Sequence, residues 1–299
     1  MTPSATGFAP GSRAALEAAA DGYLDALVAR DPGRLALAPG ARLTENGQEI
    51  PLGDGLWGSA TADPPPQRAV HVADVEAGQV ALLGSVAEHG RACLLGVRLR
   101  LDAAGRLAEA EQLVCRPRHS LFELFDPDGM GRDRSHLQAV VPEADRVSRA
   151  ELEGVANAYF DGIEASDGSR IPVTETCVRH ENGVQSVRRP SPEGGFGGGH
   201  MRVAEQISSG MFRYIGGIRG RRYPVCDIER GLVLAIGLFD HPGKLTSVDV
   251  AGIGTVELPE FATRPSSALI FEVFQVRGGT ITAIEALLDF FPYGMPTGW

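Results

Sequence analysis

The sequence predicts an α+β fold of two tandem cone-shaped domains, each with N-terminal helices packed on a curved antiparallel sheet. The main observation is an internal repeat, in which a stretch of the chain returns 136 residues later without a gap. A repeat of this length counts whole domains rather than solenoid units. We therefore expect a first domain over 1–131, a linker over 132–147 and a second domain over 148–299. The matched residues are Tyr23, Asp25, Asp31, Arg34, Glu45, Asn46 and Gly47, which recur as Tyr159, Asp161, Asp167, Arg170, Glu181, Asn182 and Gly183.

Each copy is expected to open with an amphipathic helix. In the second domain, Ser148 followed by Glu151 forms the pattern of a capping box at a helix start. Apolar residues then recur at helical spacing up to Ile163, and the first domain repeats this spacing from Leu16 to Leu27. Short helical turns are expected to follow at 31–35 and 167–171.

The second observation is that the pattern of each copy changes to strands after these helices. In the first domain we expect strands over 70–76, 79–88, 93–102 and 106–115, and in the second over 223–229, 232–240, 268–276 and 280–290. The offset between the copies grows from 136 to 153 and then to 174 residues, so the second domain carries two insertions. The first insertion contains the glycine-rich segment 192–200, which could close over a ligand or form a surface loop.

Composition excludes several classes of function. The 299 residues are 43% apolar with a net charge of -10, which provides for two cores and argues against a nucleic-acid or anionic-membrane partner. No apolar run of membrane-spanning length is present, and the N-terminus lacks the apolar core of a signal peptide. The four cysteines show no CxxC spacing, which favours reduced thiols. We expect a soluble, cytoplasmic protein.

Two segments carry a resemblance to a known superfamily. The segment from Tyr23 to Asp31 resembles the opening helix of the ketosteroid isomerases and SnoaL-like polyketide cyclases, within the nuclear transport factor 2-like superfamily. The segment from Val276 to Glu285 is similar to the last hairpin of that superfamily. The resemblance implies a pocket at the open end of each curved sheet. It does not imply one reaction, because the superfamily includes isomerases, cyclases, epoxide hydrolases, dehydratases, lyases and binding modules.

The resemblance also implies roles for two residue types. Tyr23 and Tyr159 lie at the place of the isomerase tyrosine that donates a hydrogen bond to an oxyanion, and Glu45 and Glu181 lie at or next to the place of its proton-shuttling carboxylate. Glu45 also extends an apolar row on one strand face, where the pKa of a carboxyl rises toward neutrality. The alternative is that the tyrosines are core residues and that Glu181 begins the Asn182-Gly183 turn.

The resemblance predicts one absence as well. The isomerases have a second, protonated acid on the strand before the last hairpin. This chain has Leu94, Leu95 and Gly96 there in the first copy, and Leu269 and Ile270 in the second. The sequence thus predicts that this acid is missing.

Differences between the copies favour the second domain as the working site. His180 replaces Thr44, and histidine moves protons near neutral pH. Asp227, like Asp74, is in line with apolar strand residues, which suits a pocket acid or base, or an ion pair with an arginine such as Arg222. Further candidate substrate-binding residues are Asn182, His200, Arg222, Tyr223 and His241.

Metal and nucleotide chemistry have weaker support. His180, His200, His241 and Asp227 could converge, but no HxH or HExxH spacing fixes them as ligands. The glycine-rich segment lacks the Gly-Lys-Ser/Thr of a phosphate loop. We therefore expect neither a metal nor a cofactor.

The sequence leads to one main functional hypothesis. It is a cofactor-independent acid/base enzyme, an isomerase, cyclase, dehydratase or retro-aldol lyase, acting on a small hydrophobic or aromatic oxygenated molecule. Glu181 or Asp227 would take the proton, His180 would relay it, and Tyr159 would stabilise the oxyanion. The alternative is a non-catalytic module that binds a small molecule or a protein. The two domains are expected to pair within the chain, and further homo-oligomerisation stays open.

Overall fold

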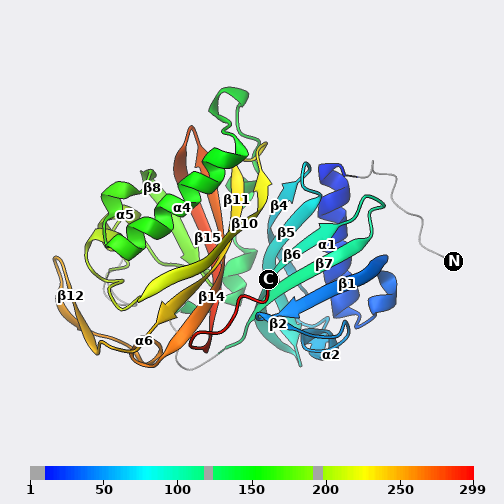
Figure 1. The fold of residues 1–299 in the computed structure, drawn as a ribbon, viewed down its shortest axis with the longest axis horizontal. Helices are drawn as coiled ribbons and strands as arrows, with labels where there is room; N and C mark the ends of the chain where they lie inside the picture. The colour runs from blue at the N-terminus through cyan, green and yellow to red at the C-terminus, as the bar shows by residue number, and fades with distance from the viewer. Residues whose placement is uncertain (1–10, 118–123, 191–197) are drawn as a thin grey trace.

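The computed structural model of the protein describes residues 11–117, 124–190 and 198–299, and it has the predicted α+β architecture of helices on curved sheets. Figure 1 shows two domains side by side. The elements of the first are α1 (Arg13–Val28), η1 (Pro32–Arg34), β1 (Leu37–Glu45), β2 (Gln48–Glu49), α2 (Leu56–Ser59), β3 (Ala60–Thr61), β4 (Gln67–Asp74), β5 (Gln79–Glu88), β6 (Arg91–Leu101) and β7 (Leu107–Cys115).

The second domain repeats this order and adds elements from its insertions. Between the domains lie η3 (Pro127–Gly131), α3 (Ser135–Gln138) and η4 (Glu143–Asp145). The second domain consists of α4 (Arg149–Ala165), η5 (Gly168–Arg170), β8 (Val173–Glu181), β9 (Val184–Gln185), α5 (Val203–Ser208), β10 (Gly217–Asp227), β11 (Leu232–His241), β12 (Ser247–Val250), β13 (Gly254–Glu257), α6 (Glu260–Thr263), β14 (Ser266–Arg277) and β15 (Thr280–Pro292).

The helix starts follow from the sequence as predicted. The Ser148 side chain accepts a hydrogen bond from the Glu151 backbone N–H, and the Glu151 carboxylate accepts one from the Ser148 backbone N–H, so the capping box of α4 is confirmed. The 3-10 turns η1 and η5 each begin after an aspartate, Asp31 and Asp167, whose side chain accepts a backbone N–H two residues on. In the described part of the chain, no helix is long and apolar enough to cross a membrane.

Each sheet is an antiparallel meander to which one parallel strand is added. In the first domain β4, β5, β6 and β7 pair in antiparallel fashion, and β1 then lies parallel to β7. In the second domain β10, β11, β14 and β15 follow the same order, with β8 parallel to β15. The parallel pairing places Glu45 opposite Gln112, and Glu181 opposite Ala286.

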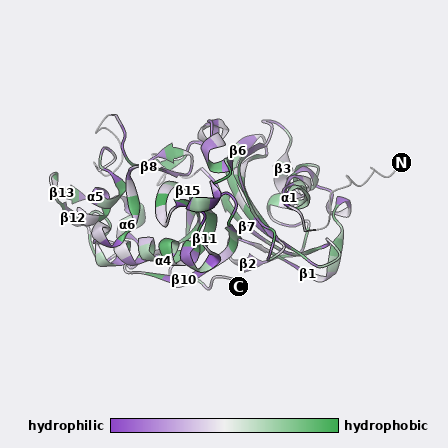
Figure 2. Cartoon of the chain, turned by 90° about the horizontal axis from the view of Figure 1, so that it is seen from above, coloured by the Kyte–Doolittle hydropathy of each residue, from purple (hydrophilic) through white to green (hydrophobic). Residues whose placement is uncertain are grey.

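Helices cover one face of each sheet, and the two remaining faces pack against each other. Leucine and valine side chains of β4, β5, β6 and β7 join those of β10, β11, β14 and β15 in one apolar cluster between the domains. Close packing of this cluster depends on Gly96, because a Cβ atom at that position would lie 2.9 Å from the ring of Phe271. Seen from above, the domains lie along one axis, with α1 and the β12–β13 hairpin toward opposite ends (Figure 2).

Two related ion pairs cross this interface. Arg149, the first residue of α4, pairs with Asp74 at 2.6 Å, and Arg13, the first residue of α1, pairs with Asp227 at 2.5 Å. Asp74 also accepts a hydrogen bond from the Cys226 backbone of the other domain. Both aspartates are 1% exposed, so each needs its cation. In each pair, an arginine at the start of one domain's first helix binds a buried aspartate of the other domain.

The C-terminal segment lies against the first domain. The indole N–H of Trp299 donates a hydrogen bond to the Thr44 hydroxyl at 2.9 Å. The guanidinium groups of Arg42 and Arg98 lie 4.2 and 4.6 Å from the Trp299 ring centroid. The last residue of the chain thereby contacts the first strand of the first copy.

Candidate active site

In the first domain, buried hydrogen bonds fix the tyrosine and the glutamate of the repeat. The hydroxyl of Tyr23 accepts a hydrogen bond from the Trp57 indole at 3.1 Å and donates one to Gln112 at 3.0 Å. Gln112 donates in turn to Glu45, whose carboxylate also accepts the backbone N–H of Leu56. Tyr23 and Trp57 are at most 1% exposed. In the first copy the tyrosine and the glutamate are therefore structural residues.

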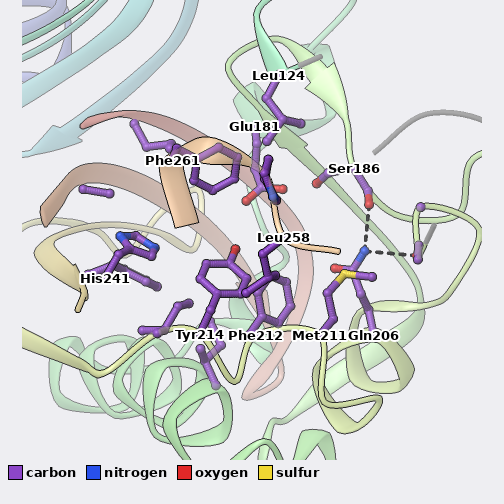
Figure 3. Close-up of a pocket in the computed structure, with 18 of the residues that line it drawn as sticks. Leu124, Glu181, Ser186, Gln206, Met211, Phe212, Tyr214, His241, Leu258 and Phe261 are labelled. Atoms are coloured by element: carbon purple, nitrogen blue, oxygen red, sulfur yellow. Dashed lines mark hydrogen bonds between the residues drawn. The ribbon is translucent and has the colours of Figure 1, made fainter. Parts of the chain in front are cut away.

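The second domain instead encloses a cavity of about 660 Å³, a volume typical of small-molecule sites. Its walls are mainly apolar and aromatic, and part of them comes from the second insertion through β13, α6 and the segment between them. Figure 3 shows Phe212, Tyr214, Leu258 and Phe261 around this space. The apolar wall residues are Leu124, Ile163, Met211, Phe212, Ile215, Phe239, Ile253, Val256, Leu258, Pro259, Phe261, Ala268, Ile270, Leu288 and Phe290.

Arg179 organises the polar end of the cavity. Its guanidinium donates hydrogen bonds to the Tyr159 hydroxyl and the Ser186 hydroxyl, both at 3.0 Å, and to the Gln206 side-chain carbonyl. Its Nε atom also lies 3.2 Å from a carboxylate oxygen of Glu181. The Gln206 amide in turn donates a hydrogen bond to the Ser186 backbone oxygen, drawn as a dashed line in Figure 3. Because Arg179 is 2% exposed, these partners replace the water that the charge has lost.

Glu272 lies in the same group but lacks full pairing. It is 2% exposed, and its Oε2 atom has no hydrogen-bond partner in the described part of the chain. Burial and, to a smaller extent, the nearby Glu181 carboxylate raise the pKa of Glu272 to about 8, against the opposite effects of Arg179 and Tyr159. Glu272 therefore carries a proton at neutral pH and can donate it into the cavity.

Tyr159 is the second donor at this end. Burial raises the pKa of Tyr159 well above its ordinary value, so the hydroxyl keeps its proton. The Tyr159 oxygen accepts a hydrogen bond from Arg179, and the hydroxyl also hydrogen-bonds the Glu272 carboxyl. Tyr159 and Glu272 are thus two neutral, mutually hydrogen-bonded O–H groups beside one guanidinium–carboxylate pair.

The two copies differ at the positions that build this group. Repeat spacing places Arg179 where the first copy has Leu43. Strand pairing places Glu272 opposite Ala235, as Val97 lies opposite Leu82, and it places Ala286 where the first copy has Gln112. Two apolar core positions of the first copy thus hold ionisable side chains in the second, and the second copy lacks the amide that fixes the tyrosine and the glutamate in the first.

Three of the predicted site residues line the cavity. They are Tyr159 and Glu181 at the polar end, and His241, which is 3% exposed and stacks on the Tyr214 ring at 5.3 Å between centroids. Burial lowers the pKa of His241 to about 4, so its imidazole is neutral at physiological pH. The other predicted site residues, Asp227, His180, Asn182, His200, Arg222 and Tyr223, are not among the residues that line the cavity.

Asp227 and Arg222 belong to the domain interface instead. Asp227 is bound by Arg13, and Arg222 pairs with Glu111 of the first domain at 2.5 Å. Asp227 does not line the cavity, and its contacts are those of the ion-pair alternative, with Arg13 in place of Arg222. Strand parity identified a buried acid correctly, but it could not show that the facing partner comes from the other copy.

The remaining predicted residues have local structural contacts. Asn182 is fully buried and exchanges hydrogen bonds with the Leu288 backbone through both atoms of its amide, while the Tyr223 hydroxyl donates to Asn157. His200 is exposed. His180 lies 3.5 Å from Glu285, and burial together with Arg134 lowers its pKa to about 4, which does not suit a proton relay at neutral pH.

Only the end of the glycine-rich segment lies within the described residues. Gly198 and Gly199 line the cavity, whereas the expected closing segment 192–197 lies outside the described residues. The residues that the structure describes include no group of three or more His, Cys, Asp or Glu side chains able to hold a metal ion.

The sequence analysis did not identify Glu272 or Arg179 as site residues. An acid was sought at Leu269 and Ile270 and predicted to be missing, but the structure has one two residues further along the same strand. Ala268, Ile270 and Phe274 share the inward face of β14 with Glu272, so an acid within an apolar strand was the available signal. Arg179 in place of Leu43 was a second signal, because an arginine inside a core position requires partners.

Comparisons with known proteins give one family and a set of remote structures. A family model described as "Domain of unknown function (DUF8021)" matches residues 9–106 and 145–288, one segment in each copy. None of the curated proteins matches the chain.

Three of the similar solved structures are each shorter than this chain. A cystatin-like protein of unknown function from Methylobium petroleophilum is 18% identical, with 36% of this chain and 80% of that chain covered and a TM-score of 0.29. A steroid delta-isomerase from Pseudomonas aeruginosa is 20% identical, covering 35% and 82%, with a TM-score of 0.27. PrhC from Penicillium brasilianum is 13% identical, covering 47% and 82%, with a TM-score of 0.28.

Proposed function

The chain belongs to the DUF8021 family, and we propose that its second domain is an acid/base enzyme that moves a proton on a small, hydrophobic, oxygenated molecule. We place this domain in the nuclear transport factor 2-like superfamily, as the opening helix and last hairpin suggest. The observation that carries the proposal is the cluster of Glu181, Glu272 and Tyr159 around Arg179 at the closed end of an apolar cavity.

The two carboxyl groups are suited to opposite tasks. Glu181 pairs with Arg179, and in the proposed reaction its carboxylate accepts a proton from a carbon next to a substrate carbonyl. Tyr159 and the protonated Glu272 donate hydrogen bonds to the carbonyl oxygen as it becomes an enolate oxygen.

The same first step serves several outcomes. Return of the proton from Glu181 to a different carbon gives an isomer, and departure of a hydroxyl group from the neighbouring carbon, protonated by Glu272, gives a dehydrated product. The apolar walls favour a substrate whose surface is mostly hydrocarbon or aromatic. Burial in this cavity strengthens each hydrogen bond to the developing charge.

The proposal is tested by proton exchange on a simple ketone. We expect the protein to accelerate exchange of the α-protons of 2-tetralone in D2O, followed by proton NMR. Glu181→Gln should lose at least about 100-fold of that acceleration, the usual scale for a general base. Tyr159→Phe should lose a smaller part, because Glu272 remains as a donor.

The matched control is the equivalent change in the first copy, Glu45→Gln, which should leave exchange unchanged. Acceleration equal in the wild type and Glu181→Gln would contradict the proposal. Binding of the ketone with no exchange at all would support the alternative of a non-catalytic binding module.

A further inference from the structure

The cavity has a second polar point that the proposed chemistry does not use. His241, at the end of β11, is 3% exposed, and its Nδ1 atom has no hydrogen-bond partner among the described residues. In Figure 3 it lies across the cavity from Ser186 and Gln206, with Tyr214 and Leu258 between them in this view. A buried nitrogen without a partner costs free energy unless a ligand supplies one.

Aromatic rings hold the His241 imidazole in place. Its ring is stacked on Tyr214 with an interplanar angle of 21°, and it lies 5.2 Å from the Phe290 centroid and 6.4 Å from the Phe261 centroid. Rings packed in this way accept a flat aromatic ligand by stacking or edge contact. The imidazole is therefore a fixed polar atom within an aromatic end of the cavity.

We infer that the natural ligand is a flat, neutral aromatic or polycyclic molecule with an oxygen at each end, one bound by Tyr159 and Glu272 and the other a hydroxyl bound by His241. This inference rests on the proposed function only for the site and the role of the first oxygen. A hydroxyl both donates and accepts, so it satisfies Nδ1 in either tautomer of the imidazole.

The charge at the His241 end of the cavity favours a neutral ligand over an acid. The carboxylates of Glu257 and Glu260 line the wall built by the second insertion, and Asp240, which precedes His241, is paired with Arg219. Of the two arginines that line the cavity, Arg179 is already paired with Glu181, and Arg189 lies beside Gly199. Because the imidazole is uncharged, a carboxylate at this end would be buried without a cation.

The inference is tested by binding rather than by turnover. Two pairs of compounds are compared by fluorescence titration, 2-naphthol with 2,6-dihydroxynaphthalene and 4-phenylphenol with 4,4′-biphenol, so that two lengths are covered. In at least one pair we expect the diol to bind wild type about 5- to 10-fold more tightly than the mono-ol, the scale of one buried hydrogen bond. The matched acid, 6-hydroxy-2-naphthoic acid, should bind less tightly than 2,6-dihydroxynaphthalene.

Substitutions of His241 separate hydrogen bonding from shape. His241→Phe keeps an aromatic ring and should abolish the preference for the diol. His241→Asn returns a polar atom near the position of Nδ1 and should restore part of it. Equal binding of both members of both pairs by wild type, or an undiminished preference in His241→Phe, would overturn the inference.

The binding experiment and the exchange experiment distinguish failure of this inference from failure of the proposed function. A preference for the diol that depends on His241, without ketone exchange, would sustain this inference while the acid/base proposal fails. Exchange that depends on Glu181, without any preference for a diol, would do the reverse.

Discussion

At the scale of single residues, Glu272 sets the chemistry of the site and also its dependence on pH. A carboxyl whose pKa is raised on folding binds more protons in the folded than in the unfolded chain. Its contribution to stability is therefore complete below its ordinary pKa of 4.5 and is lost as the pH rises through about 8. The same group thus links proton donation to the stability of the second domain.

This linkage predicts the behaviour of Glu272→Gln. The variant keeps a hydrogen-bond donor but cannot ionise. The difference in free energy of unfolding, variant minus wild type, should therefore increase from pH 5 to pH 9. We expect a relative gain of at least about 1 kcal/mol, since one pKa unit corresponds to 1.36 kcal/mol. Urea unfolding followed by circular dichroism measures it.

The control for this series is Glu76→Gln, which removes a carboxylate with a side chain 79% exposed. It should shift stability equally at both pH values. A Glu272→Gln curve parallel to that of wild type would show that Glu272 ionises as an ordinary surface carboxyl does.

At the scale of elements, the bounds of the meander strands were largely predictable, whereas the elements of the second insertion were not. The meander strands were expected within a few residues of their observed bounds, except that β10 begins at Gly217 rather than at 223. The second insertion was located, but its hairpin and α6 were not foreseen. These elements have short, mixed sequences, and their apolar residues pack on Met211 and Tyr214, which are distant from them in sequence.

The dependence on residues distant in sequence also explains why only part of the site was predicted. Repeat alignment identified Tyr159 and Glu181, because both copies retain them. It did not identify Glu272, because the equivalent residue of the first copy, Val97, is an ordinary core residue. A polar group lies in a cavity because of side chains on several strands together, whereas a sequence pattern describes the faces of one strand only.

Strands β8 and β14 should be coupled through Arg179 and Glu272. Arg179→Leu alone leaves Glu181 and Glu272 without their cation and should cost roughly 3 kcal/mol, the scale of a broken buried ion pair. Adding Glu272→Val restores the pair of residues found in the first copy. The double variant should then be more stable than the sum of the single changes by at least about 1 kcal/mol.

Thermodynamic cycles from urea unfolding give this coupling energy. Exact additivity of the two substitutions would show that the side chains do not interact. The single variant Glu272→Val serves as the internal reference, because it keeps the contacts of Arg179 with Glu181, Tyr159 and Gln206.

At the scale of the whole molecule, the domains are held together by an apolar interface and two reciprocal ion pairs. Arg13→Ala would leave Asp227 buried with backbone donors alone, from Ala73 and Arg230. We expect a loss of about 2 to 3 kcal/mol in the free energy of unfolding, at the low end for a broken buried pair because Arg13 keeps 20% exposure. Urea unfolding measures the loss.

The control is Arg34→Ala, which breaks a pair with Asp31 whose side chains are both more than half exposed. It should cost less than about 1 kcal/mol. An Arg13 variant no less stable than this control would mean that the interface depends on its apolar cluster and not on the reciprocal ion pairs.

The positions of Trp57 and Trp299 have a practical consequence for spectroscopy. They are the only tryptophans among the 299 residues, one in the core of the first domain and the other on its surface. Indole emission should therefore report unfolding of the first domain. It should change little when a ligand binds in the cavity of the second domain, because neither indole lines that cavity.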